Sequence, residues 1–387
     1  MINYGRQDIH QDDIDAVAEV LRSDFLTQGP AIPRFEDRIA SHVGAAYAVA
    51  VNSATSALHI ACLALDLGPG DILWTVPNTF VASANAARYC GANVDFVDID
   101  PDTWNMSVPE LESKLEAAKN SGRLPKVLIP IHFGGQPTEQ EAIWDLAQQY
   151  GFRVVEDASH AVGASHNGEP AGSARWSDIA IFSFHPVKII TTGEGGMALT
   201  NDEALAWRMA TLRTHGITKD QTHFVNESPG PWYHEQQMLG FNYRMTDIQA
   251  ALGLSQFGRL EEYVARRNLL ADRYHKELAV LPLRLPVVRD GNVSAYHLYM
   301  IRLRLDEISK THRQVFDELG DHGVRANLHY IPVHLQPYYR ALGFTEGQFP
   351  EAEAYGSDAI TIPLYPNLTE VQQDQVIRAL EEILEPQ

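Results

Sequence analysis

The chain of 387 residues carries 50 acidic and 30 basic side chains, which gives a formal net charge of −20. A surface of this charge repels nucleic acids and anionic membranes, so neither is predicted as a partner. Hydrophobic residues make up 45% of the chain and charged residues 21%, the proportions of a globular protein with a substantial core. Only two cysteines occur, Cys62 and Cys90, too few for a disulfide framework or a cysteine-rich zinc site.

The sequence also gives no support for a membrane protein, a secreted protein or a metal-dependent protein. The first residues are polar, and no apolar run approaches the roughly 20 residues of a membrane span. We therefore expect a cytoplasmic protein. The histidines at 312, 322, 329 and 334 lie at least five residues apart without clustered carboxylates, so no metal is predicted.

Short apolar runs alternate with helical stretches from about residue 47 to residue 200. The pattern predicts strands at residues 47–51, 71–75, 94–97, 127–131, 153–156, 179–184 and 197–200. Helices are predicted between them at residues 53–65, 80–89 and 139–150. This alternation indicates βαβ units and a mostly parallel sheet covered by helices, which is an α/β fold.

The character of the chain changes after residue 246. A long helix is predicted over residues 246–279 with a break near Gly258, followed by a strand at 296–303 and helices at 311–319 and 369–384. These elements predict a smaller α+β domain. We place the large domain, with an N-terminal segment that contacts substrate, at residues 1–250 and the small domain at residues 251–387.

One of the seven lysines, Lys188, has unusual neighbours. It follows the apolar strand at 179–184 and lies in the segment HPVKIITTGEGG, residues 185–196. Desolvation lowers the proton affinity of an amine, which is what a lysine that binds a carbonyl cofactor requires. The alternative is a lysine that extends its amine into solvent from the end of a strand.

Asp157 ends another predicted strand, at the edge where open α/β sheets bind ligands. A carboxylate there can hold the ring nitrogen of pyridoxal 5'-phosphate (PLP) protonated. The alternative is an ordinary cap at the start of a helix. The segment NSATSAL, residues 52–58, offers helix N-terminal amides and hydroxyls to a phosphate, although capping explains Ser53 equally well. Phe80 is a candidate ring-stacking residue or, alternatively, a core aromatic.

Five separated segments, in this order, resemble the DegT/DnrJ/EryC1/StrS sugar aminotransferases. They are NSATSAL (52–58), TFVA (79–82), EDASHA (156–161), FSFHPVK (182–188) and GFNYRMTDIQAA (240–251). The resemblance covers almost the whole chain. It implies the aspartate aminotransferase-like (type I) PLP fold, with a large domain and a smaller C-terminal α+β domain. It also implies a homodimer with active sites at the subunit interface.

The resemblance implies a role for each matching residue. Lys188 is expected to bind PLP covalently and Asp157 to pair with the pyridine nitrogen. Phe80 is expected to stack on the ring, and His160 to lie near its phenolic oxygen. The groups expected to hold the phosphate are Thr55, Ser183, the backbone amides of Ala54, Thr55 and Ser56, and Asn242 of the other subunit.

A finer match is to the transaminases of pseudaminic acid biosynthesis. It rests on Tyr4 and on segments 24–29, 185–196 and 239–256. This subgroup moves an amino group from L-glutamate to UDP-2-acetamido-2,6-dideoxy-β-L-arabino-hexos-4-ulose, giving UDP-4-amino-4,6-dideoxy-N-acetyl-β-L-altrosamine. The residues that it implies for binding the nucleotide sugar are Tyr4, Asp24, Phe25, Leu26, Thr27, Asn327, Leu328, His329 and Tyr330.

Three alternatives remain at this point. The chain could aminate another UDP- or dTDP-linked keto-sugar. A PLP-dependent sugar dehydratase of similar sequence carries histidine in place of the cofactor lysine, so Lys188 disfavours that activity. A non-catalytic ligand sensor is disfavoured because Lys188, Asp157 and Ser183 are all present.

Overall fold

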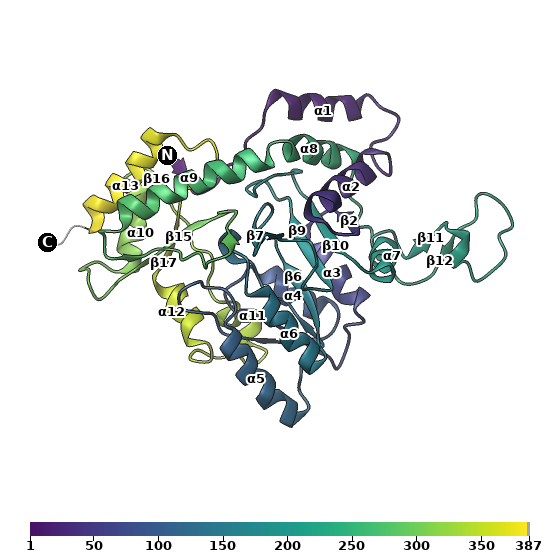
Figure 1. Ribbon diagram of the computed structural model, residues 1–387, viewed down its shortest axis with the longest axis horizontal. Helices are drawn as coiled ribbons and strands as arrows, with labels where there is room; N and C mark the ends of the chain where they lie inside the picture. The colour runs from purple at the N-terminus through teal and green to yellow at the C-terminus, as the bar shows by residue number, and fades with distance from the viewer. Residues whose placement is uncertain (385–387) are drawn as a thin grey trace.

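A seven-stranded, mostly parallel sheet forms the centre of the computed structural model, which describes residues 1–384 (Figure 1). The strand order is β2-β10-β9-β6-β5-β3-β4. Their bounds are β2 Tyr47–Val51, β3 Ile72–Thr75, β4 Asn93–Phe96, β5 Val127–Leu128, β6 Arg153–Asp157, β9 Ile179–Ser183 and β10 Gly196–Thr200. Only β10 runs antiparallel to its neighbours. The predicted α/β fold class is confirmed.

The reversed direction of β10 determines where the loop before it lies. Because β9 and β10 are antiparallel neighbours, residues 184–195 remain at the carboxyl end of β9. The carboxyl ends of β2, β3 and β6 lie at the same edge, because these strands run in the same direction as β9. Loops from four strands therefore meet there.

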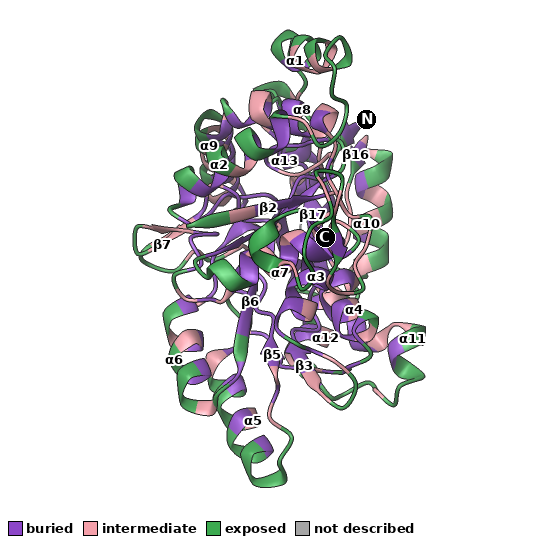
Figure 2. Cartoon of the chain, turned by 90° about the vertical axis from the view of Figure 1, so that its right-hand side faces the viewer, coloured by how far each residue is buried: buried purple, intermediate pink, exposed green. Residues whose placement is uncertain are grey.

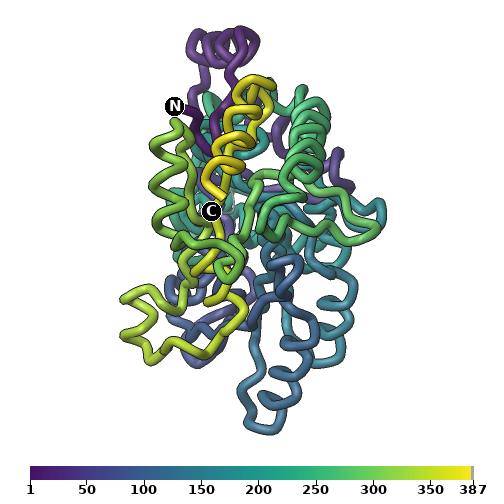
Figure 3. The backbone as a smooth tube through the Cα atoms, turned by 90° about the vertical axis from the view of Figure 1, so that its left-hand side faces the viewer, coloured from purple at the N-terminus to yellow at the C-terminus, as the bar shows by residue number. Residues whose placement is uncertain are grey.

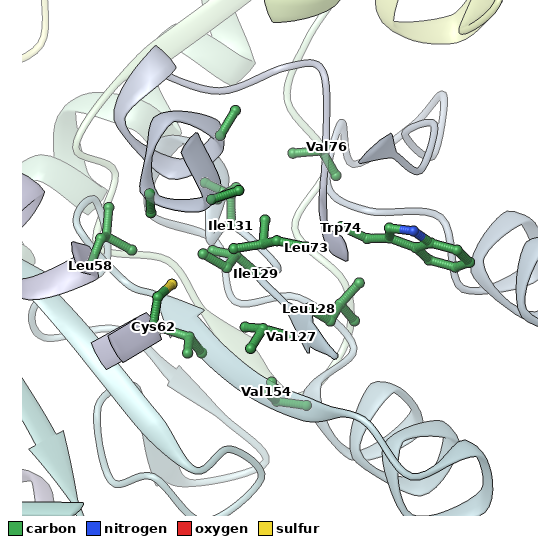
Figure 4. Close-up of a cluster of buried hydrophobic side chains, with 14 of the residues drawn as sticks. Leu58, Cys62, Leu73, Trp74, Val76, Val127, Leu128, Ile129, Ile131 and Val154 are labelled. Atoms are coloured by element: carbon green, nitrogen blue, oxygen red, sulfur yellow. The ribbon is translucent and has the colours of Figure 1, made fainter. Parts of the chain in front are cut away.

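Helices pack on the sheet and bury its two faces. They are α2 Ala31–Val43, α3 Ala54–Ala64, α4 Val81–Tyr89, α5 Val108–Ser121, α6 Gln140–Tyr150 and α7 Glu203–Leu212. The largest apolar core includes Leu58 and Cys62 of α3 and Leu73 and Trp74 of β3, and Figure 4 shows the Trp74 ring pointing away from Leu58 and Cys62. Figure 2 shows buried strands at the centre and exposed outer faces on α5 and α6.

The C-terminal part of the chain builds a second, smaller layer. Its helices are α8 Asp247–Phe257, α9 Leu260–Leu278, α10 His312–Asp321, α11 Pro337–Arg340, α12 Pro350–Asp358 and α13 Glu370–Leu384, and its antiparallel sheet is β13 Leu283–Arg284, β15 Tyr299–Leu303 and β17 Ala359–Ile362. The predicted interruption of the long helix is confirmed, because α8 and α9 are separated at Gly258. The proposed domain boundary falls within α8 and stays a prediction.

Residues near the N-terminus join this second layer. Strand β1 Ile2–Asn3 pairs with β16 Val324–Arg325, and Figure 3 shows the N-terminus beside the C-terminal helices. The first helix, α1 Gln11–Leu21, packs on α8. Small outlying strands complete the fold: β7 Ser165–His166, β8 Glu169–Pro170, β11 Ile217–Thr218, β12 Glu235–Gln236 and β14 Asn292–Val293. No helix within residues 1–384 combines the length and apolarity of a membrane span.

Two strands are three residues shorter in the structure than predicted from the sequence. Strand β5 ends at Leu128 instead of residue 131, shortly before Pro130, which has no N–H to donate to the ladder. Strand β15 begins at Tyr299 instead of residue 296, because Tyr296 has a positive φ of 43°. Helices α1, α2, α5, α7 and α12 were not predicted.

Gly196 permits the close approach of β10 to the start of α3. A Cβ atom there would lie 2.5 Å from the amide nitrogen of Ala54 and 2.5 Å from the carbonyl carbon of Ser53. We predict that Gly196→Ala lowers the free energy of unfolding by ~1–3 kcal/mol, because backbone atoms cannot move aside as a flexible side chain can. Gly320→Ala is the matched control, since a Cβ in this helix meets nothing within 4 Å and should stabilise by about 0.5–1 kcal/mol. Urea denaturation of both variants measures the difference, and equal stabilities would contradict the prediction.

Candidate active site

A cavity of about 980 Å³ opens where the loops of the large sheet meet the C-terminal layer. Most of the predicted site residues line it: Tyr4, Ala54, Thr55, Ser56, Phe80, Asp157, His160, Ser183, Lys188, Asn327, Leu328, His329 and Tyr330. They come from both ends of the chain and from four different loops. The fold therefore brings together side chains up to 326 positions apart, from Tyr4 to Tyr330.

Lys188 reaches this cavity from the segment between β9 and β10. Its backbone N–H donates to the carbonyl of His185 at 2.9 Å, which closes a turn directly after the strand. Burial lowers the pKa of its amine to about 8, and the negative charge of Asp157 partly opposes this shift. A lysine that reached for bulk solvent would not lose proton affinity in this way. The amine is thus set up for covalent chemistry near neutral pH.

Asp157 lies at the carboxyl end of β6 and is almost fully buried. One carboxylate oxygen accepts a hydrogen bond from the Ser83 hydroxyl at 2.8 Å, and the other accepts one from the amide of Ser159 at 3.1 Å. Residues 158–164 form turns and no helix follows. The helix-cap alternative is therefore wrong, and the carboxylate is left facing a cavity that also contains a lysine.

The first turn of α3 provides anion-binding groups on the same wall. Ser53 caps this helix by accepting the N–H of Ser56 at 3.1 Å. The first amides of a helix lack partners within the helix, so those of Ala54 and Thr55 are available to a ligand. Ser183 adds a hydroxyl from the end of β9. Together these groups suit a phosphate.

Phe80 precedes α4 and lines the cavity with 57% of its surface exposed. A core aromatic would be buried, so the core alternative is wrong. The ring centroid of Tyr330 lies 6.1 Å from that of Phe80. An exposed ring beside Asp157 and Lys188 is a suitable surface on which a flat heteroaromatic ring can stack.

His160 presents a defined nitrogen to the cavity. Its Nδ1 accepts the N–H of Gly134 at 3.3 Å, so the ring proton is on Nε2, which lies 3.4 Å from the Tyr330 hydroxyl. Burial, with the nearby charges of Lys188 and His329, holds the pKa of His160 well below its usual value. His160 is therefore a neutral hydrogen-bond donor at physiological pH.

The segment 327–330 is held against the C-terminal sheet. Asn327 and Thr361 exchange backbone hydrogen bonds of 3.1 and 2.7 Å. His329 Nδ1 contacts the Thr361 hydroxyl at 2.9 Å, and its ring packs edge-on against Tyr4 with centroids 5.1 Å apart. Burial lowers the pKa of His329 to about 3, with a further contribution from Lys188. The N-terminal and C-terminal parts of the chain thus share one wall of the cavity.

Five predicted residues do not line this cavity. Asp24, Phe25, Leu26 and Thr27 are exposed in the segment between α1 and α2, and Asn242 is exposed beside Thr214. Other residues that line the cavity were not predicted as site residues, and the polar ones among them include Ser83, His185, Glu194, Gln249 and His297. Ser83 could have been found, because it lies one helical turn after Thr79. No sequence pattern indicated His297, which lies just before β15 in the C-terminal layer.

The residues present fit PLP. A partly buried amine, a buried carboxylate, helix N-terminal amides and an exposed aromatic ring correspond to the aldehyde, pyridine nitrogen, phosphate and ring of that cofactor. The profile of the DegT/DnrJ/EryC1/StrS aminotransferase family matches residues 7–381. The chain belongs to this family. It is a PLP-dependent sugar aminotransferase with the type I fold.

Relatives and solved structures agree with this assignment. GDP-perosamine synthase of Caulobacter vibrioides is 36% identical over 372 residues, covering 96% of this chain and 95% of the relative. The structure of the sugar aminotransferase Spr1654 of Streptococcus pneumoniae in its PMP form is 28% identical, with a TM-score of 0.89 and 99% of each chain covered. Helicobacter pylori PseC, an aminotransferase of pseudaminic acid biosynthesis, is 27% identical, with a TM-score of 0.89 and 99% of each chain covered.

The buried histidine at position 329 predicts acid sensitivity. A histidine has a pKa of about 6.5 in the unfolded chain, and about 3 at this position in the folded protein. Between these values the unfolded state binds a proton that the folded state does not, so stability falls as pH falls from about 6.5 towards 3. We predict that His329→Gln reduces the slope of the unfolding free energy against pH in this range by about 1.4 kcal/mol per pH unit. Urea denaturation of the cofactor-free protein across this range measures it, with His10→Gln as the exposed control. An unchanged slope in His329→Gln would contradict the prediction.

Proposed function

We propose that this chain is a cytoplasmic enzyme that transfers the amino group of L-glutamate to C4 of UDP-2-acetamido-2,6-dideoxy-β-L-arabino-hexos-4-ulose. The product is UDP-4-amino-4,6-dideoxy-N-acetyl-β-L-altrosamine, an intermediate of pseudaminic acid biosynthesis. The observation that carries the proposal is the convergence of Lys188, Asp157 and His160 with Tyr4 and the segment 327–330 in one cavity.

Each residue near the ring has a specific task in this proposal. PLP, when bound, supplies the carbonyl group and the electron sink for exchange of the amino group. Lys188 moves the proton at Cα of the donor and, in reverse, at C4 of the sugar, and a pKa of about 8 leaves a useful fraction of its amine unprotonated near neutral pH. Asp157 holds the pyridine nitrogen protonated, with Ser83 orienting its carboxylate. The Nε2–H of His160 would donate a hydrogen bond to the phenolic oxygen of PLP.

The nucleotide sugar is assigned to the wall built from both ends of the chain. Tyr4, Asn327, His329 and Tyr330 offer hydroxyl, amide and imidazole groups there. Asp24, Phe25, Leu26, Thr27 and Leu328 complete the proposed sugar-binding set. The side chains of Asp24 to Thr27 are exposed and lie outside this chain's cavity, which is compatible with a site completed by a second subunit.

A second candidate acceptor is favoured by one comparison. The identity to GDP-perosamine synthase is 36%, against 27% to PseC. A GDP-linked 4-keto-sugar is therefore the competing acceptor, together with the UDP- and dTDP-linked keto-sugars that other enzymes of this kind use.

A panel of acceptors separates these candidates. The PLP-loaded protein, with glutamate, is incubated with the L-arabino keto-sugar, its D-configured isomer, and dTDP- and GDP-linked 4-keto-sugars, and products are measured by mass spectrometry. We predict the highest kcat/KM for the UDP-linked L-arabino compound. His329→Ala and Tyr330→Ala should raise KM for this sugar more than KM for glutamate, since glutamate has no nucleotide. Faster turnover of another sugar would overturn the substrate assignment and leave the aminotransferase intact.

The proposed homodimer shares its active sites through Asn242. This side chain is exposed and does not line the cavity of its own chain, which supports a contact with the cofactor phosphate of the other subunit. Lys188→Ala and Asn242→Ala subunits are each expected to be inactive. Mixed equally, random exchange should restore about a quarter of wild-type activity, because each mixed dimer contains one intact site.

The matched control mixes Lys188→Ala with Asp157→Asn. Both residues line the cavity of the same chain, so no mixed dimer of these variants has an intact site. Activity is measured after subunit exchange has been verified by mass spectrometry of differently labelled subunits. Absence of recovery in the Asn242 mixture, or equal recovery in the control, would contradict shared sites.

A further inference from the structure

A buried imidazole–carboxylate pair lies outside the cavity, directly behind its catalytic carboxylate. His132 Nε2 is 2.8 Å from Glu156 Oε1, and the two side chains are 0% and 2% exposed. Neither residue lines the cavity. Burying a carboxylate is costly unless it is fully hydrogen-bonded, so the pair requires an explanation in terms of what it holds in place.

Glu156 is held by partners from two other segments. Its Oε1 also accepts the N–H of Gly172 at 3.0 Å, and its Oε2 accepts the Ser177 hydroxyl at 3.3 Å. Successive side chains on a strand point to opposite faces of a sheet. Glu156 therefore anchors β6 on the face opposite to that of Asp157, the next residue, and limits how far the end of this strand can move.

His132 contacts the same strand a second time through its backbone. Its N–H donates to the carbonyl of Asp157 at 3.1 Å, while the N–H of Asp157 donates to the carbonyl of Pro130 at 3.0 Å. The side chain of His132 thus holds Glu156, and its main chain holds Asp157. Two consecutive residues of β6 are attached to one residue of the neighbouring loop.

The other ring nitrogen of His132 determines the shape of that loop. Nδ1 accepts the N–H of Thr138 at 3.0 Å, so the ring proton is on Nε2. Nε2 lies 2.8 Å from Glu156 Oε1, a close contact in which the N–H is not aligned for a hydrogen bond. The closed loop contains the 3₁₀ turn Phe133–Gly135, and the Gly134 N–H donates to Nδ1 of His160. The direction of this last bond sets which nitrogen of His160 carries its proton.

The loop has little freedom to adjust by itself. Gly134 and Gly135 have φ values of 65° and 108°. A Cβ on Gly134 would lie 2.5 Å from Cε of Met300, and one on Gly135 would lie 2.8 Å from the amide nitrogen of Tyr296. The loop is therefore closely packed against the C-terminal layer, and a shift at His132 is transmitted to the Gly134 amide.

We propose that His132 is a positioning residue for the reaction, which sets the place of Asp157 through β6 and the orientation and tautomer of His160 through the 132–138 loop. The inference rests on the roles given to Asp157 and His160 in the proposed function. His132 does not line the cavity, so it acts through Asp157 and His160.

Three substitutions of His132 separate its side-chain contact with Glu156 from its hydrogen bond with Thr138. His132→Gln retains an N–H group close to Glu156 and loses the acceptor for Thr138, whereas His132→Asn retains an acceptor near Nδ1 and loses the contact with Glu156. His132→Leu removes both. The matched control is His334, whose Nε2 lies 2.8 Å from Glu353 Oε1 with the ring 0% exposed, and which does not line the cavity.

The readouts are the pH titration of the visible absorption band of bound PLP, the Kd of PLP for the cofactor-free protein, and the single-turnover rate with glutamate alone. For His132→Leu we expect a shifted titration midpoint and a single-turnover rate at least about 10-fold lower, because misplacement of catalytic groups lowers rate more than binding. The glutamate concentration that gives half of the maximal single-turnover rate should change less than about twofold. His132→Gln and His132→Asn should each retain part of the rate. His334→Leu should lose stability in urea denaturation and keep the wild-type spectrum and rate.

The proposal is overturned if the His132 variants have wild-type spectra and rates, or if His334→Leu shifts them equally. If His132→Leu does not fold, the two milder variants carry the test. No sugar enters these measurements, so a wrong acceptor assignment leaves the result valid. A wrong assignment of the cofactor residues is detected separately, because Lys188→Ala would then retain the single-turnover reaction.

Discussion

Strand β10 runs antiparallel to both of its neighbours, and the position of Lys188, the proposed catalytic lysine, depends on this reversal. Because β9 and β10 form an antiparallel pair, the twelve or so residues between them cannot leave the carboxyl edge of the sheet. Lys188 is therefore at the edge where β6 delivers Asp157 and where α3 begins. Strand β10 also lies in close contact with the first turn of α3. Gly196 permits this contact because it has no Cβ.

The electrostatics of the cavity depend on burial more than on net charge. Among the residues that line the cavity in the described part of the chain, Lys188 is the one lysine and there is no arginine. The histidines at 160, 297 and 329 are held neutral because burial lowers their pKa values. An anionic phosphate must then be met mainly by helix amides and hydroxyls, which bring no full charge to pair with the Asp157 carboxylate.

The second layer of the molecule completes the site and supports it. Segment 327–330 reaches the cavity because Asn327 pairs with Thr361, and Tyr4 reaches it because β1 pairs with β16. The same layer packs against Gly134 and Gly135, whose loop orients His160. The second layer therefore both forms one wall of the cavity and holds the loop that orients His160.

Much of the large sheet could be predicted from the sequence, because its buried strands are short apolar runs separated by helical periodicity. Strand β2 was predicted to the residue, and β3, β4, β6, β9 and β10 to within two residues. Helices α1 and α5 were not predicted, and both bury little of their surface: Asp13 is the buried residue of α1, and Leu111, Leu115 and Ala118 are those of α5. Lys188, Asp157, Phe80 and the start of α3 were found because each follows a strand and carries an uncommon residue for that place.

The sequence by itself determined the fold class and the family, since these follow from local patterns and from motifs in a set order, and the same motifs supplied the residues that are proposed to meet PLP. Only the tertiary structure decided which alternatives hold: Asp157 is not a helix cap, and Phe80 is exposed in a cavity instead of buried in the core. It alone revealed Ser83 behind Asp157 and the pair formed by His132 and Glu156. Such contacts join residues 24 and 74 positions apart, and no local pattern encodes a distance that is set by how strands and helices pack.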